Sequence, residues 1–441
     1  MAASVFDSPL YAQLFATGDA GRLFSDSAAI RAMLLVEGAL AKVQGDLGVI
    51  PELSAAAIHR ASMEIQIDPG AIAKATGENG VSVPGLVTAF RDEMQAPEHA
   101  QFAHWGATSQ DIIDTALMLR QRQALALAES DLRAILGALG DQAAEHATLP
   151  MAARTYGQYA TPTTWGAVVA EWGLPLLDAL DQLQSVRNGA LWVSLSGASG
   201  TASALGPQAA ETRAALAKAL GLRDPKRTWH SDRSPLLRIA DWQGQVMAGL
   251  AHMAQSAFAL TSSDSQEVSL GSAGASSTMP QKQNPVGPSA LIALSHHFGG
   301  LRSSLQTAAA HQHQRDGAAW FTEWMVVPQL SLALASALHH AKRLAQGIAP
   351  RPVQMHSNLE ASLGLIHAEA LSFALAELMP RPEAQKATKA LCLDVMEKRS
   401  PLQDLARAAY PALDARAFDP VAGAGNAAQS AYDFAQRAKA L

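Results

Sequence analysis

The residues of this chain best suited to do chemistry lie in one polar run, residues 271–285. Small and hydroxyl-bearing residues crowd it, and a single cation, Lys282, is followed by Asn284. Ser and Thr compete for backbone hydrogen bonds and Gly carries an entropy penalty, so a core helix is not expected here. A loop with hydroxyl and amide donors, one cation and a helix starting after it is suited to hold a carboxylate.

Two further polar patches interrupt the chain, at residues 104–111 and 154–165. In the first patch, Thr108 or Ser109 can cap the helix that follows, and a helix N-terminus favours an anion. Taken singly, these two residues could equally well cap the helix without contacting a ligand, and His104 could equally well be an ordinary structural histidine. From these residues alone, two interpretations of the first patch stay open: that it contacts substrate, or that its role is structural.

Long segments with apolar residues at helical spacing surround the three patches. They predict helices at residues 110–146, 162–188, 236–263, 287–312 and 324–347. At a rise of ~1.5 Å per residue the first is over about 50 Å long, whereas ordinary helices average about a dozen residues. Five helices of such length predict one elongated central bundle.

The whole chain is therefore expected to be all-α, with three domains. The first is a helical domain over residues 1–109, the second is the central bundle of five long helices over residues 110–351, which carries the loop 271–285, and the third is a small helical domain over residues 352–441. Within the first domain, a helix is predicted at residues 21–48 with Ser25 or Asp26 as its N-cap. Residues 67–84 contain several Gly and Pro and are expected to be mostly loop.

Composition narrows the class of protein. Of 441 residues, 49% are hydrophobic and only 5% aromatic, which favours closely packed helices. The net charge of −6 provides no basic field for nucleic acid or an anionic membrane. A single cysteine, Cys392, allows no intrachain disulfide. Because neither a secretory signal nor a long uncharged apolar run is apparent, the expected location is cytoplasmic, with no membrane partner.

The ten residues 276–285, SSTMPQKQNP, resemble the signature loop S-S-x-M-P-x-K-x-N-P of the fumarase/aspartase superfamily. The resemblance implies that Ser276 and Lys282 are catalytic, Ser276 as general base or acid with Ser277 as its nearest competitor. It implies that Ser277, Met279 and Asn284 bind substrate. Enzymes of this superfamily move a proton at a carbon next to a carboxylate, and each donor to the resulting extra charge is worth roughly 3–4 kcal/mol in comparable sites.

The other two patches resemble further conserved regions of the superfamily. HWGATSQDIIDT resembles the first, which implies that Thr108 and Ser109 bind a substrate carboxylate and that His104 contacts substrate. Residues 154–166 resemble the second, often G-R-T-H-x-x-x-A-x-P-T-T-x-G, and place Thr155 and Gln158 at the substrate.

The second patch departs from the superfamily pattern in its histidines. Tyr156 replaces the frequent His, and Tyr159 replaces the His that commonly follows in adenylosuccinate lyases. Since Tyr has a reference pKa of about 10, it is a poor base at pH 7. The replacement weighs against a fumarase or an adenylosuccinate lyase.

Four shorter runs, at residues 197–201, 228–233, 314–324 and 358–370, are most similar to the bacterial 3-carboxy-cis,cis-muconate cycloisomerases of this superfamily. That subfamily also lacks the His at position 156, although Trp is its usual residue there. Its reaction interconverts 3-carboxy-cis,cis-muconate and the γ-carboxymuconolactone in the β-ketoadipate route of aromatic catabolism. A carboxylate of the substrate itself attacks, so no water need be activated. The substrate is a tricarboxylate, and Arg315 or Arg154 can supply a further bidentate anion contact.

The resemblance also implies a homotetramer in which each active site draws on three subunits. We expect no cofactor and no metal, because the chain has no H-E-x-x-H and its adjacent histidines diverge on a helix. Two alternatives stay open. One is another lyase of the superfamily, such as an adenylosuccinate or argininosuccinate lyase. The other is a catalytically silent structural protein on the same fold, which would have no need of Ser276, Lys282 and Asn284.

Overall fold

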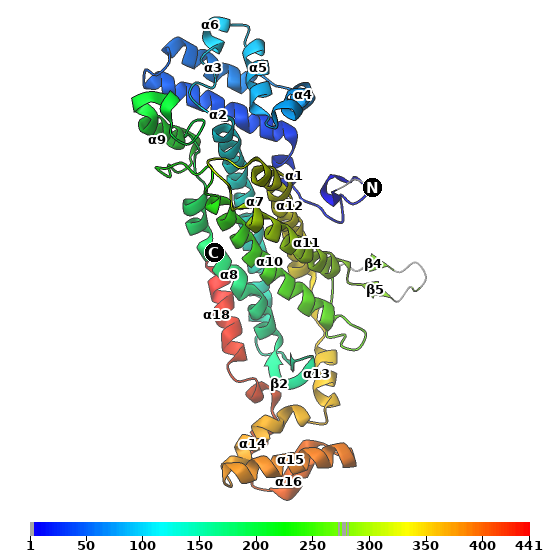
Figure 1. Cartoon of the computed structure of the whole chain (residues 1–441). Coiled ribbons are helices and arrows are strands. Elements are labelled where there is room, and N and C mark those ends of the chain that lie inside the picture. Colours follow the sequence, from blue (N-terminus) through cyan, green and yellow to red (C-terminus); the bar gives the residue numbers. More distant parts are fainter. Residues whose placement is uncertain (1–3, 272–273, 276–278, 280–281) are drawn as a thin grey trace. The chain divides into compact units, whose positions relative to one another are not determined.

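The structure, a computed structural model, describes residues 4–271, 274–275, 279 and 282–441 (Figure 1). The chain divides into two compact units, and every crossing between them lies inside a long helix. Unit 1 holds Met1–Ser130, Ala179–Met247 and Leu294–His339, and unit 2 holds Asp131–Asp178, Ala248–Ala293 and His340–Leu441. The long helices are α7 (Ser109–Glu145), α8 (Trp165–Ala190), α10 (Ser234–Leu260), α11 (Val286–Ala308) and α12 (Gly317–Gly347).

These long helices pack against one another within each unit. In unit 1, buried Ser331 of α12 accepts hydrogen bonds from Gln121 of α7 at 3.1 Å and Gln243 of α10 at 3.3 Å. Buried Trp242 of α10 donates its indole N–H to the carbonyl of Ala179 at 2.7 Å. Fully buried indole and amide groups need such partners, so these bonds set the rotation of each helix.

In unit 2 the same helices pack through a tryptophan hydrogen bond and a close contact at a glycine. Trp165 of α8 donates to Gln142 of α7 at 3.2 Å. Gly249 of α10 lies so close to Leu176 of α8 that a Cβ there would meet Leu176 Cδ2 at 2.7 Å. The expectation of an all-α fold built on long helices is confirmed.

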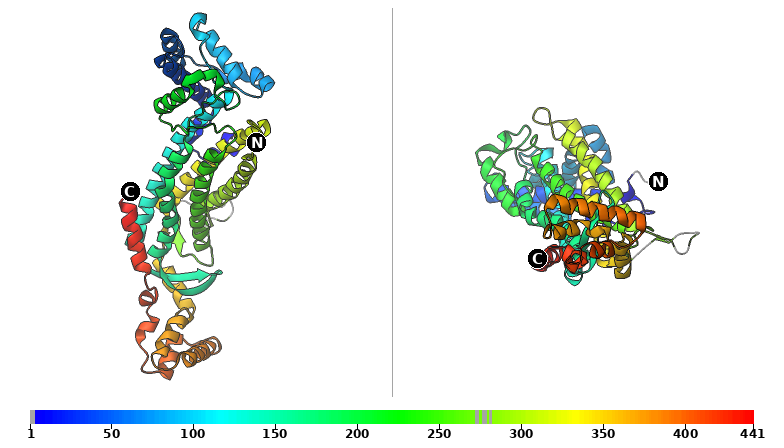
Figure 2. Two further views of the ribbon diagram at one scale, coloured as in Figure 1. Left: turned by 60° about the vertical axis from the view of Figure 1, so that its left-hand side comes forward. Right: turned by 90° about the horizontal axis from the view of Figure 1, so that it is seen from below.

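The shorter helices of unit 1 come mostly from the start of the chain. Helix α9 packs against α2 although it is distant in sequence (Figures 1 and 2). Ser25 caps α2 as predicted, since its hydroxyl accepts from Ala28 N at 3.3 Å. The bounds are α1 (Ala20–Leu23), α2 (Asp26–Asp46), α3 (Glu52–Glu64), α4 (Pro69–Asn79), α5 (Val83–Glu93), α6 (Pro97–Ala100) and α9 (Ala209–Leu220), with short 3-10 helices η1 (Val5–Asp7) and η2 (Ser203–Gln208).

The expectation of loop at residues 67–84 is wrong, because α4 occupies most of it. Asp68 accepts from Gly70 N at 3.2 Å and caps the helix, and Pro69 sits at its first position, where no N–H is needed. Gly80 ends the helix with φ +69°. The Pro and Gly that indicate a loop by composition are the start and stop residues of a helix.

Unit 2 adds a β-hairpin that the sequence analysis did not predict. Strands β1 (Pro150–Thr155) and β2 (Gln158–Thr164) pair antiparallel. Helix α13 (Pro352–Ala361) packs on β1, while α17 (Pro420–Gly423) and α18 (Ala427–Lys439) pack on β2 (Figure 2). Two shorter pairs also form, β3 (Val268–Ser269) with β6 (Ala349–Pro350) and β4 (Gly274–Ala275) with β5 (Gln283–Asn284).

The end of the chain forms a small helical cluster with its own core. Buried Leu371, Leu375, Val395, Leu402 and Ala406 contact one another there. The cluster is made of α14 (Ala368–Ala376), α15 (Arg381–Lys398) and α16 (Leu402–Ala409). Two short 3-10 helices flank it in the chain and contact α14, η3 (Leu365–His367) before it and η4 (Ala415–Phe418) after it. The division into three domains remains a prediction.

One helix in the described part of the chain, α12, is long and apolar enough by itself to cross a membrane. The bent pair Pro352–Ala361 and Leu365–Ala376 passes the same test only if counted as one span. In the structure, 56% of the most apolar stretch of α12 is buried. Burial of that kind is what a core helix of a globular protein shows.

Candidate active site

The first polar patch of the sequence meets a second segment through one carboxylate, Asp111, which is fully buried in unit 1. Its Oδ1 accepts from Ser194 Oγ at 3.0 Å, Ser196 N at 2.9 Å and His230 Nε2 at 2.8 Å. Its Oδ2 accepts from the backbone N–H groups of Thr108 at 3.1 Å and Gly197 at 2.9 Å. With these donors on both oxygens, the carboxylate joins the start of α7 to residues 194–197.

A second buried charge cluster lies one helical turn along α7. The guanidinium of Arg233, fully buried, binds Asp114 at 2.8 Å and Glu323 at 2.7 Å. Burial lowers the pKa of Arg233, but the two carboxylates raise it further, and the net direction is upward. Trp320 Nε1 and His311 Nε2 bind the same carboxylates, at 3.3 Å to Asp114 and 3.2 Å to Glu323. Arg233 is therefore fully neutralised and serves the fold.

Arg315 is placed differently from Arg233. Its Nε donates to Gln110 Oε1 at 2.8 Å, and its Nη2 donates to Thr108 Oγ1 at 3.3 Å and to the carbonyl of Ala198 at 3.2 Å. All three acceptors are neutral, and among the described residues no carboxylate pairs with it. A half-buried guanidinium without a counter-charge is suited to bind an anion. The structure thus brings the predicted site residues Thr108 and Arg315 together.

His104 and Ser109 complete the predicted residues of the first patch. Ser109 is the first residue of α7 and is half-buried. The Nδ1 atom of His104 lies 2.7 Å from Glu37 Oε1. Burial lowers the pKa of His104, but Glu37 and Asp111 raise it, and the net direction is upward.

Thr155 and Gln158, from the second patch, flank the turn of the β1–β2 hairpin in unit 2 and face each other across it. Tyr156 and Gly157 form that turn with φ of +52° and +73°, the backbone of a type I′ hairpin turn. Both predicted residues are exposed, and the side chain of Tyr156 is fully so. The hairpin presents Thr155 and Gln158 to solvent on either side of its tip.

Arg154, close to the turn of the same hairpin, is held by a buried carboxylate. Its Nη1 lies 2.8 Å from Glu267 Oε2, and Glu267, which directly precedes β3, is fully buried. Asn358 donates to the other oxygen of Glu267 at 2.9 Å. The guanidinium of Arg154 also lies 5.0 Å from the ring centre of Tyr159. Because Glu267 neutralises Arg154, Arg315 is the better of the two arginines predicted for anion binding.

The signature loop lies in unit 2. Ser276 and Ser277, predicted as catalytic and binding residues, lie outside the described residues. Met279 and Lys282 are exposed, and the N–H of Lys282 donates to the carbonyl of Met279 at 3.0 Å. Asn284 pairs with Gly274 across β4 and β5, and the helix predicted after the loop begins at Val286. Lys282 is therefore an open cation just before a helix N-terminus.

Sequence reasoning missed the residues that organise the first patch. No role was assigned from the sequence to five of these residues, Asp111, His230, Arg233, Glu323 and Glu37. Four of them lie in runs whose resemblance was noted, namely HWGATSQDIIDT and residues 228–233 and 314–324, yet their partners could not be read from spacing. For Glu37, Asp111 and Glu323 the available signal was an acidic side chain within a helical segment.

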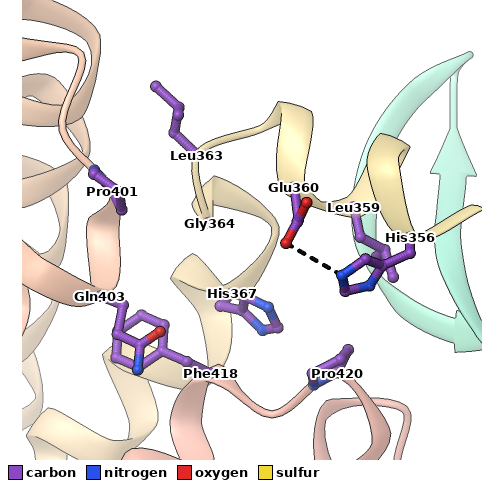
Figure 3. Close-up of a pocket in the computed structure, with 10 residues that line it drawn as sticks. All are labelled: His356, Leu359, Glu360, Leu363, Gly364, His367, Pro401, Gln403, Phe418 and Pro420. Atoms are coloured by element: carbon purple, nitrogen blue, oxygen red, sulfur yellow. Dashed lines mark ion pairs between the residues drawn. The ribbon is translucent and has the colours of Figure 1, made fainter. Parts of the chain in front are cut away.

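The described residues contain no group of three or more His, Cys, Asp or Glu side chains placed to hold a metal ion. A cavity of about 420 Å³ lies in unit 2 between α13, η3 and η4 (Figure 3). Buried His367 and Phe418 line it, with the His356–Glu360 ion pair of 3.2 Å at one side. None of the predicted site residues is among those that line this cavity.

Comparison with known proteins places this geometry in context. Residues 18–298 match the lyase family. The chain is 37% identical over 386 residues to 3-carboxy-cis,cis-muconate cycloisomerase of Pseudomonas aeruginosa, covering 86% of this chain and 84% of that protein. Among solved structures, it superposes on the 3-carboxy-cis,cis-muconate lactonizing enzyme of Pseudomonas putida with a TM-score of 0.91 at 32% identity, covering 98% and 99% of the two chains. The β-carboxy-cis,cis-muconate cycloisomerase of Acinetobacter calcoaceticus gives 0.90 at 30% identity, covering 97% and 99%.

Proposed function

Because this chain belongs to the lyase family that the sequence analysis describes as the fumarase/aspartase superfamily, we propose that it is a cycloisomerase interconverting 3-carboxy-cis,cis-muconate and its γ-carboxymuconolactone. The observation that carries the proposal is the similarity to cycloisomerases, 37% identity over 86% of the chain. It favours this reaction over the adenylosuccinate and argininosuccinate lyases and over a silent scaffold.

In the proposed reaction one substrate carboxylate adds to its own γ-carbon, which belongs to the double bond beside the carboxylate at the opposite end of the substrate. A C–O bond forms, and the π electrons move to the neighbouring carbon, beside another carboxylate, as an aci-carboxylate. A proton then joins that carbon, and the reverse reaction removes it. Ser276 is proposed as the residue that gives and takes this proton, with Lys282 and Asn284 stabilising the extra charge. The nucleophile belongs to the substrate, so the reaction needs no base at Tyr156.

The charges of the described residues support a polycarboxylate substrate. Arg315 has only neutral partners, and Lys282 is exposed at the end of the signature loop. Thr108, Ser109, Thr155 and Gln158 add hydroxyl and amide groups for hydrogen bonds. We propose that the protein acts as a homotetramer whose active sites are shared between subunits, and that it works in the cytoplasm.

The experiment is to offer purified protein the muconate, adenylosuccinate and argininosuccinate separately and to follow ultraviolet absorbance. The muconate is expected to react, and the two succinyl compounds are not. Reaction of either succinyl compound instead would replace the proposal, and no reaction with any of the three would favour the scaffold. Ser276→Ala is expected to abolish turnover without changing the thermal unfolding temperature, and a substantial residual rate would remove Ser276 from the proton-transfer role.

A further inference from the structure

His104 is held in an unusual backbone conformation by its neighbours. Its φ of +63° lies in the left-handed region, which a non-glycine residue adopts at a cost. The chain on either side is anchored, since Arg91 donates to the carbonyl of Ala103 and Gln44 donates to that of Trp105, both at 2.8 Å. These bonds fix where the imidazole starts and leave little freedom for the ring.

Glu37 of α2 fixes the ring itself. Its Oε1 lies 2.7 Å from His104 Nδ1, and its side chain is only 1% exposed. Its other oxygen, Oε2, is buried without a hydrogen-bond partner among the described residues. A carboxylate buried with a single charged partner is costly for folding, so a purely structural role accounts for it poorly.

The environment of His104 favours its charged form. The charged groups facing it are Glu37 on α2, Asp111 on α7 and Arg91 on α5. Burial and Arg91 lower its pKa, whereas Glu37, through its charge and its hydrogen bond, and Asp111 raise it, and the net direction is upward. The side chain is 19% exposed, and Nε2 has no partner within the described chain. The ring thus turns one N–H toward Glu37 and leaves the other for a ligand.

A second buried histidine shows the contrast. His230 also pairs with a carboxylate, Asp111, at 2.8 Å, but its side chain is only 2% exposed and its Nδ1 is enclosed. His230 therefore has no open edge with which to meet a substrate, whereas His104 has one.

We propose that Glu37 is a positioning residue which keeps His104 protonated, with Nε2–H turned outward to bind one carboxylate of the substrate. This inference rests on the proposed function, because the ligand it names is the polycarboxylate substrate of that reaction. Glu37 acts through His104 and touches no substrate itself.

The first test is Glu37→Gln, which keeps the shape of the side chain and removes its charge. Losing a charge-assisted contact is expected to lower kcat/KM by about 10- to 100-fold at pH 8. In the wild type, the raised pKa keeps His104 charged to higher pH. Without Glu37, burial lowers that pKa, so the alkaline limb of the kcat/KM profile moves to lower pH and activity recovers toward pH 6. An alkaline limb in the same place in both proteins would overturn the proposal.

A double-mutant cycle separates positioning from an independent effect. If Glu37 acts through His104, Glu37→Gln combined with His104→Asn should be no slower than His104→Asn alone. If the reductions in kcat/KM of the two single variants multiply in the double variant, the proposal is contradicted. The matched control is Asp46→Asn on the same helix, where Asp46 pairs with exposed Lys42 at 3.0 Å. This control is expected to leave the pH profile unchanged.

Thermal unfolding without substrate distinguishes failure of this inference from failure of the proposed function. A histidine with a raised pKa adds stability below its unfolded pKa of about 6.5 and loses it as pH rises through the folded value. The difference in unfolding temperature between the wild type and Glu37→Gln should therefore be largest near pH 6 and become smaller toward pH 9. A pH-independent difference would refute the ion pair, whatever the substrate. A protein that passes this test but does not convert the muconate would refute only the proposed function.

Discussion

Three arginines, each in a run that resembles the superfamily, have different roles because their partners differ. Arg233 is clamped between two buried carboxylates, and Arg154 is paired with buried Glu267. Arg315 has only neutral acceptors in the described chain. Since a substrate carboxylate binds most strongly to a cation that nothing else neutralises, Arg315 is the residue expected to recognise it.

Arg315→Gln is expected to lower kcat/KM by about 10- to 100-fold, mainly through KM, because one charged contact of about 1.5–3 kcal/mol is lost in the ground state and the transition state alike. Steady-state kinetics on the muconate measure it. Arg302→Gln is the control, since Arg302 pairs with Asp241 in an exposed salt bridge of 2.6 Å. Unchanged KM in Arg315→Gln would exclude Arg315 from binding.

Arg233→Gln should lower the folding stability, whereas Arg315→Gln should weaken substrate binding. It leaves Asp114 and Glu323 buried without their counter-charge, which costs roughly 3–5 kcal/mol of folding stability. A lower unfolding temperature is therefore expected for this variant, while Arg315→Gln should unfold close to the wild type. Equal stability of the two variants would contradict the distinction drawn between these arginines.

Tyr156 shows why a residue type cannot be interpreted apart from its backbone. It occupies a hairpin turn with positive φ and its side chain is fully exposed. Tyr159 instead lies with its ring 5.0 Å from the guanidinium of Arg154. Both tyrosine side chains are exposed within this chain, so neither has buried surroundings here.

At the scale of elements, the site depends on how helix starts are joined to the segments beside them. Asp111 lies in the first turn of α7 and accepts from Ser196 N and Gly197 N, which belong to the segment after α8. The hairpin is joined similarly to the base of the signature loop, through Arg154 and Glu267. Buried carboxylates therefore set the positions of segments whose exposed neighbours are proposed to bind the substrate.

The hairpin runs directly into α8, and Gly166 allows this close approach. A Cβ at Gly166 would lie 2.5 Å from Ala143 O and 2.7 Å from Ala147 Cα, both backbone atoms of unit 2. Gly166→Ala is thus expected to destabilise the protein by about 1–3 kcal/mol. Gly137→Ala on α7, where a Cβ would meet nothing within 4 Å, should instead stabilise it by up to about 1 kcal/mol. Thermal unfolding measures both, and shifts of the same sign would contradict the packing described.

At the scale of the whole molecule, the long helices leave large apolar side chains exposed. Phe258 near the end of α10, Val286 at the start of α11, and Phe321 and Met325 on α12 are each more than two-fifths exposed. Apolar side chains exposed on long helices are typical of surfaces that pack against another chain. They support the proposed tetramer, and light scattering on purified protein measures its mass directly.

The proposal that active sites are shared between subunits makes a second prediction, which tests more than the mass of the oligomer. Arg315 bonds Thr108 within one chain, whereas the proposed sites take the signature loop from another chain. At a substrate concentration well below the wild-type KM, Ser276→Ala protein should be inactive and Arg315→Gln protein about 10- to 100-fold less active than the wild type. Dissociated and reassembled together, the two variants should therefore regain activity at that concentration. Random mixing at equal amounts gives about a quarter of sites with both residues intact.

The control for this mixing experiment is each variant dissociated and reassembled alone, which should show no gain in activity at the same substrate concentration. Mixed proteins that form tetramers but show no regain would mean that Ser276 and Arg315 of a given site come from the same chain. The proposed sharing would then be wrong, although the proposed reaction would still stand.

Much of this protein follows from its sequence alone. Periodic apolar residues determine the long helices, because burying one face of a helix requires that spacing. The SSTMPQKQNP run and the two other patches identify the superfamily and most of the residues proposed to bind substrate, since residues that meet a ligand lie in exposed segments with distinctive composition.

Tertiary structure decided which charges are free to act. No spacing in the sequence pairs Glu37 with His104, 67 residues apart, or Arg233 with Asp114, 119 residues apart. Whether an arginine binds substrate or supports the fold depends on whether a carboxylate distant in sequence neutralises it. The β1–β2 hairpin and α4 likewise became visible only in three dimensions, because in both places packing and capping outweighed local composition.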